Sequence, residues 1–340
     1  MSAADLVLAA MWVGLTAYAL LGGADFGAGF WDLVAGGAKK GAPQRTLIEH
    51  SIGPVWEANH VWLIFVLVTL WTGFPTAFAA IMSTLYVPLT LAAFGVILRG
   101  SAFAFRKSVS EVSLKRLFGA TFATSSVITP FFLGTVAGAV ASGRVPPGTA
   151  RGDVVTSWLN PTSVLGGTMA VGVCAYLAAV YLCGDARRDG DDDLAEGFRA
   201  RAIVTGVVMG AFALAGVAVL AADAPKLFDG LTGRALPLMV ASGVAGVASL
   251  VLLTRRDYTL ARIAAAVAVT AVIWGWGVGQ YPYLLEPDFT VVEAAASPAA
   301  LKPLLVTMVV AAVLVGPPLV ALFVMFQRTE RGNTGSREDA

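Results

Sequence analysis

The residues best suited to chemistry lie together in the stretch SIGPVWEANHVWL at residues 51–63. Glu57 can bind and release a proton, and His60, three residues later, falls on nearly the same face of a helix. Gly53 and Pro54 precede them, and because proline is favoured in the first turn of a helix, we expect a helix to begin there. The apolar run that follows makes this a membrane helix. An ionisable pair one to two turns inside such a helix indicates a functional site, since no water is there to solvate it.

The composition of the whole chain predicts an all-α polytopic membrane protein. Of its 340 residues, 57% are hydrophobic and 13% are charged, whereas soluble domains carry about 25% charged residues. Apolar runs of about 17–25 residues are long enough to cross a bilayer. Nine such spans are predicted at 6–21, 55–71, 76–98, 117–141, 162–183, 202–222, 236–253, 261–281 and 303–326.

The distribution of basic residues predicts the orientation of these spans. With nine spans and the amino terminus outside, 18 of the 23 Lys and Arg residues face the cytoplasm and 5 face the outside. The positive-inside rule therefore predicts an outer amino terminus and a cytoplasmic carboxyl terminus. The formal net charge of only +1 gives no support to a nucleic-acid partner.

This topology brings further polar residues to the depth of Glu57 and His60. Asp25 lies at the cytoplasmic end of the first span, and Arg99 ends the third span. A buried carboxylate there, with arginine and histidine in reach, is suited to take up protons from the cytoplasm. The alternative is a buried ion pair that only fixes helix register. Glycines at 22, 23, 27 and 29 predict a close helix contact around Asp25, and a capping role for Asp25 is the plainer alternative.

Other segments are predicted to have structural roles. Residues 71–75 are predicted to form a tight turn that makes the second and third spans antiparallel neighbours. Arg106 and Lys107 are expected to be solvated cytoplasmic anchors. Cys174 and Cys183 are about 13 Å apart along one helix, too far for a disulfide. Residues 282–303, which include Glu286, are expected to form an outer surface loop.

Several kinds of site are not supported by the sequence. It contains no phosphate-binding glycine loop, no dinucleotide fingerprint in a strand-turn-helix setting and no zinc pattern. His50 and His60 are the only histidines, too few to ligate several haems within the membrane. If this chain serves a redox enzyme, we expect a partner subunit to hold the cofactors, with no metal or cofactor site here.

An ordered set of motifs in the first third resembles subunit II of the cytochrome bd-type quinol oxidases, their haem-free membrane subunit. The set consists of GGADFG at 22–27, SIGPVWEANHVWL at 51–63, FP at 74–75, STLYVPL at 83–89, RG at 99–100 and FAFR at 103–106. The resemblance implies two four-helix bundles plus one extra helix. It divides this chain into a first bundle at 1–142, a second at 143–283, and an outer loop, ninth helix and cytoplasmic tail at 284–340.

The resemblance also implies a function in the aerobic respiratory chain, in the bacterial plasma membrane. Subunit I would hold two haems b and one haem d, oxidise quinol, and reduce dioxygen to water by four electrons with protons drawn from the cytoplasm. The acid of the Trp-[Asp/Glu]-x-Asn motif belongs to a proton route in that family, which corresponds here to Glu57, with Asp25, His60 and Arg99 in support. Glutamate replaces the aspartate of some members, and His60 stands where glutamine or glutamate is common. The quinone type, whether the third haem is d or b, and the presence of small accessory subunits stay open.

Two other functions stay open at this point. A proton-coupled secondary transporter would bind its substrate near the midplane at broken helices, for which the only indications are Pro88, Pro130 and the pair Pro317-Pro318. A purely structural membrane partner would have no proton role. A transporter would be purified without haem, and the visible spectrum of the isolated complex therefore tests the first alternative.

Overall fold

Helices account for nearly all of the chain in the computed structural model, which describes residues 2–37, 39–52, 56–109 and 111–335. Gly53, Pro54 and Val55, where we expect the second span to begin, lie outside the described residues. The elements in chain order are α1 (Ala3–Ala17), η1 (Tyr18–Gly22), α2 (Gly23–Leu33), α3 (Ala42–Ile52), α4 (Trp56–Gly73), α5 (Pro75–Thr84), α6 (Tyr86–Ser108), α7 (Val112–Ala141), α8 (Pro161–Arg188), α9 (Asp192–Asp223), α10 (Pro225–Thr232), α11 (Leu236–Thr254), α12 (Tyr258–Gln280), β1 (Tyr283–Leu285), β2 (Phe289–Thr290), α13 (Val291–Ala294) and α14 (Pro298–Gly335).

The predicted all-α polytopic class is confirmed. Within the described ranges, eight helices are long and apolar enough to cross a membrane, or up to nine if the bent pair α4 and α5 is one span. The first of these runs continuously from Ala3 to Leu33 through α1, η1 and α2. Polar N-caps set the start of several of them, because Ser2, Asn160, Asp191 and Asp257 each accept a first-turn N–H on their side chain.

The chain turns sharply within 71–75 as predicted, but the expectation that this turn joins the second span directly to the third is wrong, because the short helix α5 lies between them. The chain bends by 118° between α4 and α5, and the predicted third span is interrupted at Leu85 before α6 begins. Pro75 begins α5, and Pro88 has no N–H to donate to Thr84, so neither proline can continue the preceding helix. Phe74 and Leu85 are fully buried at the two bends. As a result α4 packs against α1 and α14, while α6 packs mainly against α7.

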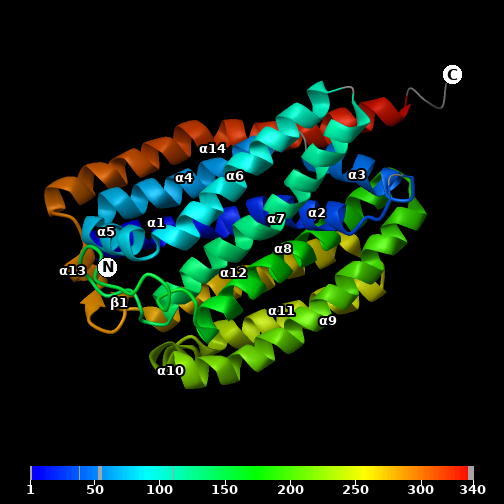
Figure 1. Ribbon diagram of the computed structural model, residues 1–340. Helices are drawn as coiled ribbons and strands as arrows, with labels where there is room; N and C mark the ends of the chain where they lie inside the picture. The colour runs from blue at the N-terminus through cyan, green and yellow to red at the C-terminus, as the bar shows by residue number, and fades with distance from the viewer. Residues whose placement is uncertain (1, 38, 53–55, 110, 336–340) are drawn as a thin grey trace.

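The connecting segments gather at the two ends of the bundle (Figure 1). One end carries the start of α1 together with α5, α10, β1 and α13, and the other carries α3. The end with α5 and β1 has an apolar cluster of its own, which contains Phe74, Leu85, Leu285 and Val291. Residues 282–303 are therefore not a plain surface loop: they form a two-stranded hairpin and a short helix, and Glu286 is buried.

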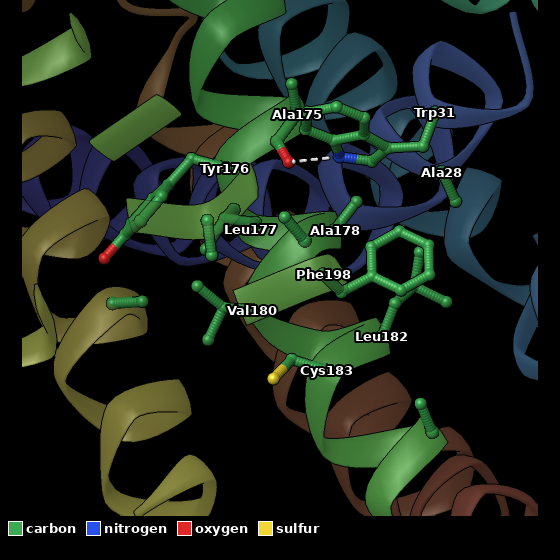
Figure 2. Close-up of a cluster of buried hydrophobic side chains, with 14 of the residues drawn as sticks. Ala28, Trp31, Ala175, Tyr176, Leu177, Ala178, Val180, Leu182, Cys183 and Phe198 are labelled. Atoms are coloured by element: carbon green, nitrogen blue, oxygen red, sulfur yellow. Dashed lines mark hydrogen bonds between the residues drawn. The ribbon is translucent and has the colours of Figure 1, made fainter. Parts of the chain in front are cut away.

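The main core surrounds α8, which contacts α2, α7 and α9 (Figures 1 and 2). The Trp31 indole of α2 donates a hydrogen bond to the backbone carbonyl of Ala175, and Leu177 and Val180 are fully buried beside it (Figure 2). The close contact predicted from the glycines is confirmed at Gly27, where a Cβ would overlap the carbonyl of Cys174 on α8. This packing fixes α2, which carries Asp25, against α8.

Candidate functional site

A cluster of buried polar side chains joins α2, α4, α6 and α7. We call it the Asp25 cluster, and it comprises Asp25, Asn59, Arg99 and Ser126. Asn59 Nδ2 donates to Asp25 Oδ2 at 2.5 Å. Arg99 Nη2 donates to the backbone carbonyl of Asp25 at 2.9 Å, and its Nε donates to Ser126 Oγ at 3.1 Å. Asp25 and Arg99, which we expected at one depth on two different spans, are thus in direct contact.

Arg99 is enclosed by protein on all sides, with only 1% of its surface exposed. The rings of Phe26 and Phe122 lie 4.6 Å and 5.0 Å from its guanidinium carbon, within the range of cation–π attraction. Burial of a guanidinium is unfavourable unless donors and charge are satisfied, and the carbonyl of Asp25, the Ser126 hydroxyl and the two rings do this together.

The wall of the cluster toward the membrane centre contains Tyr18 and His60. Tyr18 begins the π-helical segment η1, and its ring lies 6.2 Å from that of His60, which in turn lies 6.1 Å from Phe26. The Tyr18 hydroxyl and Asn59 Oδ1 are buried without a hydrogen-bond partner among the described residues. Buried polar atoms of this kind are commonly satisfied by ordered water. The cluster therefore has the groups needed to hold water and a proton beside the Asp25 carboxyl.

Glu57 does not belong to this cluster. Asn59 points inward to Asp25, and a residue two positions earlier on a helix is rotated by about 200°, so Glu57 lies on nearly the opposite side of α4. Its side chain is exposed, and our expectation of a buried carboxylate is wrong for this chain taken alone. His60, one residue after Asn59 and three after Glu57, is half-buried. The sequence thus brings α4 to the level of Asp25 and Arg99 correctly, but it does not predict that Glu57 faces away from them.

The depth of Glu57 follows from the lengths of the neighbouring helices. Asp25 lies eight residues before the end of α2, and Arg99 lies nine residues before the end of α6, which correspond to about 12 Å and 13 Å at 1.5 Å per residue. Because Asn59 contacts Asp25 directly, Glu57 lies roughly 9–10 Å inside the ends of those helices. The exposed carboxyl therefore lies in the first turn of α4, at a level short of the ends of α2 and α6.

A second charged network at the same end was not expected from the sequence. Asp32, only 5% exposed, accepts hydrogen bonds from Arg45 at 2.7 Å and from Arg106 at 3.0 Å. Arg106 also pairs with Glu49 at 3.1 Å. The expectation that Arg106 is a solvated anchor is therefore wrong, because it ties α6 to α2 and α3. The sequence signal was the aspartate at the end of a glycine-rich membrane helix, which needs cationic partners when buried.

The described residues contain no group of three or more His, Cys, Asp or Glu side chains that could hold a metal ion. Cys174 and Cys183 are both buried free thiols, as their predicted separation requires. The chemistry that this part of the chain can support is hydrogen bonding, charge stabilisation and proton exchange at carboxyl groups.

Comparison with known proteins gives a consistent set of relatives. Residues 3–326 match the family described as cytochrome bd terminal oxidase subunit II. The putative cytochrome bd menaquinol oxidase subunit II of Bacillus subtilis is 22% identical over 340 residues and is aligned over 96% of each chain. The cytochrome bd-I ubiquinol oxidase subunit 2 of Escherichia coli is 29% identical over 214 residues, which cover 61% of this chain and 54% of that protein.

A solved structure has the same fold. A chain in the structure of the bd oxidase from Geobacillus thermodenitrificans superposes with a TM-score of 0.77 at 24% sequence identity. The match covers 96% of this chain and 99% of that one. The similarity thus extends over nearly the full length of both chains.

Proposed function

This chain belongs to the cytochrome bd terminal oxidase subunit II family, and on that premise we propose that it is the haem-free subunit of a bd-type quinol oxidase that helps to deliver protons to the oxygen-reducing centre. Membership implies a respiratory oxidoreductase complex in a bacterial membrane. Its partner, subunit I, would carry haems b and d and oxidise quinol. The orientation in the plasma membrane, with the amino terminus outside, is part of the proposal and is supported by the distribution of basic residues.

The reaction defines what the proton route must supply. Reduction of one dioxygen to two waters consumes four electrons and four protons, and two quinols provide the electrons. The protons released by quinol on the outer side cannot be the ones consumed if the enzyme is to generate a gradient, so protons must come from the cytoplasm. A titrating side chain that reaches from the cytoplasmic side toward the partner is therefore needed.

The position of Glu57 is the single observation that carries this proposal. It is a carboxyl group, exposed on α4 and roughly 9–10 Å inside the ends of α2 and α6. A carboxyl at such a position can take a proton from the cytoplasmic side and release it to a group on another chain. The Asp25 cluster supports this role mechanically, because the bond from Asn59 to Asp25 holds α4 in the rotation that presents Glu57 outward.

The test is to measure haem content and quinol-driven oxygen uptake together in the complex purified through a tag on this chain. Glu57→Gln keeps the shape of the side chain but cannot bind and release a proton. We therefore expect near-normal haem content and slower oxygen uptake. Each tenfold loss in rate corresponds to about 1.4 kcal/mol in the barrier. Glu111→Gln, at an exposed carboxyl on the same end of the bundle, is the control and should leave the rate unchanged.

Three outcomes would contradict the proposal. Full oxygen uptake with full haem content in Glu57→Gln would exclude the proton role. Parallel loss of haem and activity would favour a structural pairing, because breaking an ion pair that is buried in the assembly costs about 3–5 kcal/mol. A complex that contains no haem at all would favour the transporter alternative, although the sharp break that the described residues show between α4 and α5 lies at the end of the bundle rather than at its middle.

A further inference from the structure

We propose that Arg201, together with the exposed face of α9 that follows it, binds an anionic phospholipid. The lipid phosphate pairs with the guanidinium, and an acyl chain lies along Val204, Val208, Ala211 and Ala215. We call these five residues the Arg201 row. The inference goes beyond the proposed function and does not depend on it, because it requires only that α9 crosses the membrane.

The length of the uncharged part of α9 places Arg201 at a boundary of the hydrocarbon. Arg201 and Asp223 are the charged residues on either side of residues 202–222, which contain none. Those 21 residues extend for about 31 Å at 1.5 Å per residue, which matches the roughly 30 Å thickness of a bilayer's hydrocarbon core. The two charges therefore lie at the levels of the lipid phosphates, one in each leaflet.

The two boundary charges differ in how the protein neutralises them. At one boundary, Asp223 forms an ion pair with Arg144 at 2.5 Å. At the other, Arg201 contacts two aromatic rings, but it forms no ion pair and donates no hydrogen bond to any residue that the structure describes. Its neighbour Arg199 pairs with Glu196. The positive charge of Arg201 is therefore left for a group outside the described part of this chain to balance.

Two rings of the main core hold the guanidinium of Arg201 in place. Its Cζ lies 5.6 Å from the ring centroid of Trp31 on α2 and 4.9 Å from that of Phe198 on α9. Both residues are buried, and the Trp31 indole is itself fixed by its hydrogen bond to Ala175 (Figure 2). A ring face attracts a cation without using up its N–H donors. The guanidinium is thus positioned with its donors available, and its planar shape suits the oxygens of a phosphate.

The face of α9 that follows Arg201 suits a lipid chain. The members of the Arg201 row are separated by three, four, three and four residues, a spacing that places side chains above one another on a helix. Val204 and Val208 are 63% and 54% exposed, and Ala211 and Ala215 are exposed after them. The row is about 21 Å long. Its small and branched apolar side chains form a strip along which an extended acyl chain can pack.

The unbalanced charge determines the kind of lipid. Phosphatidylcholine carries its own cation beside the phosphate and therefore gains little from Arg201. The phosphate of phosphatidylglycerol has no such cation, so pairing with Arg201 neutralises both groups at the edge of the hydrocarbon, where an unpaired charge is costly. The attraction of one basic side chain for an anionic lipid corresponds to about a fivefold preference. In the proposed membrane orientation this lipid belongs to the cytoplasmic leaflet.

The test counts bound lipid by native mass spectrometry of the delipidated, tagged complex, to which phosphatidylglycerol or phosphatidylcholine is added at the same low concentration. For the wild-type complex we expect the first phosphatidylglycerol adduct to be about fivefold more abundant than the first phosphatidylcholine adduct. Arg201→Gln should abolish this preference, and Arg201→Lys, which keeps the charge, should retain most of it. Arg255→Gln is the control, because Arg255 is an exposed arginine at the same end of the bundle, and it should leave the preference unchanged.

A second variant leaves Arg201 itself intact. Val204→Glu places a carboxylate three residues away on the same exposed face, where it can pair with Arg201 in place of the lipid, and should also abolish the preference. Equal adducts of the two lipids in the wild-type complex would overturn the proposal, as would an unchanged preference in Arg201→Gln and Val204→Glu. An equal loss in Arg255→Gln would reduce the effect to general surface charge. Displacement of phosphatidylglycerol by excess inorganic phosphate would show a site for free anions and would exclude the role of the acyl chain.

Discussion

The closest approach of α2 and α8 makes a strong prediction about Gly27. In Gly27→Ala a Cβ would overlap the carbonyl group of Cys174 and lie 2.8 Å from Ala178 Cβ, whereas carbon atoms pack at about 3.5–4.0 Å. Because the obstructing carbonyl belongs to the backbone, no side-chain rotation relieves the overlap, and the helices must separate by roughly 1 Å. Overpacking of this kind costs about 1–3 kcal/mol. The roughly 0.5–1 kcal/mol that alanine gains over glycine in a helix offsets only part of it.

The assay is the midpoint of thermal unfolding of the purified complex, followed by loss of its monodisperse elution. We expect the midpoint to fall by roughly 2–4 °C for each kcal/mol of lost stability. Gly210→Ala on α9 is the control, because a Cβ there meets nothing within 4 Å, and its midpoint should stay the same or rise. Equal midpoints for the two variants would refute the description of α2 and α8 as being in backbone contact beside Asp25.

Three further predictions concern charge. Asp32→Asn should lower the unfolding midpoint, since two arginines lose their carboxylate partner at a cost of about 1–3 kcal/mol; an unchanged midpoint would contradict the network. Burial raises the pKa of Glu286 above its usual 4.5, although the positive charges of Lys226 and Arg234 act to lower it. The contribution of Glu286 to the stability of the fold is therefore fully present below pH 4.5, where the carboxyl is protonated, and is lost as the pH rises through the pKa of the folded state. Glu286→Gln should therefore raise the midpoint more at pH 8 than at pH 5, and the reverse order would exclude this account. A cysteine introduced at Ala3 should react with an impermeant thiol reagent outside intact cells and one at Gly335 should not; the opposite pattern would invert the membrane orientation.

The sequence predicts correctly which residues lie at the same level along the bundle, but not which face of α4 turns toward its interior. Helix spacing and charge placement are enough to bring Asp25 and Arg99 to one level, and the structure has them in contact. The inward face of α4 carries Asn59, which donates to Asp25, and an amide carries too little hydropathy to be detected in a pattern. The sequence therefore predicts a buried Glu57, whereas its side chain is exposed on this chain.

In the fold as a whole, the long apolar helices can be predicted from the sequence, and the short polar helix cannot. Hydropathy located the long helices, whereas α3 was missed, because its eleven residues contain both charged and apolar side chains and are too few to cross a bilayer. The ion pairs of Asp32 depend on α3 for Arg45, so they could not be predicted either. The bend at Phe74 is decided by burial against residues more than 200 positions away, such as Leu285 and Val291, which no local pattern contains.

The π-helical turn η1 divides the first span into two parts with different neighbours. Before it, α1 buries a single row of side chains and packs against α4 and α14; after it, α2 is buried on nearly every side and packs against α7 and α8. The turn is closed by a hydrogen bond from the Gly23 N–H to the carbonyl of Tyr18, five residues apart, so it holds one residue more than a regular α-helical turn. Deleting one residue there would restore a regular helix and rotate α1 against α2 by about 100°. The length and hydropathy of the span would hardly change, yet α1 would no longer turn its buried face toward α4. The one additional residue in η1 therefore sets the rotation of α1 relative to α2.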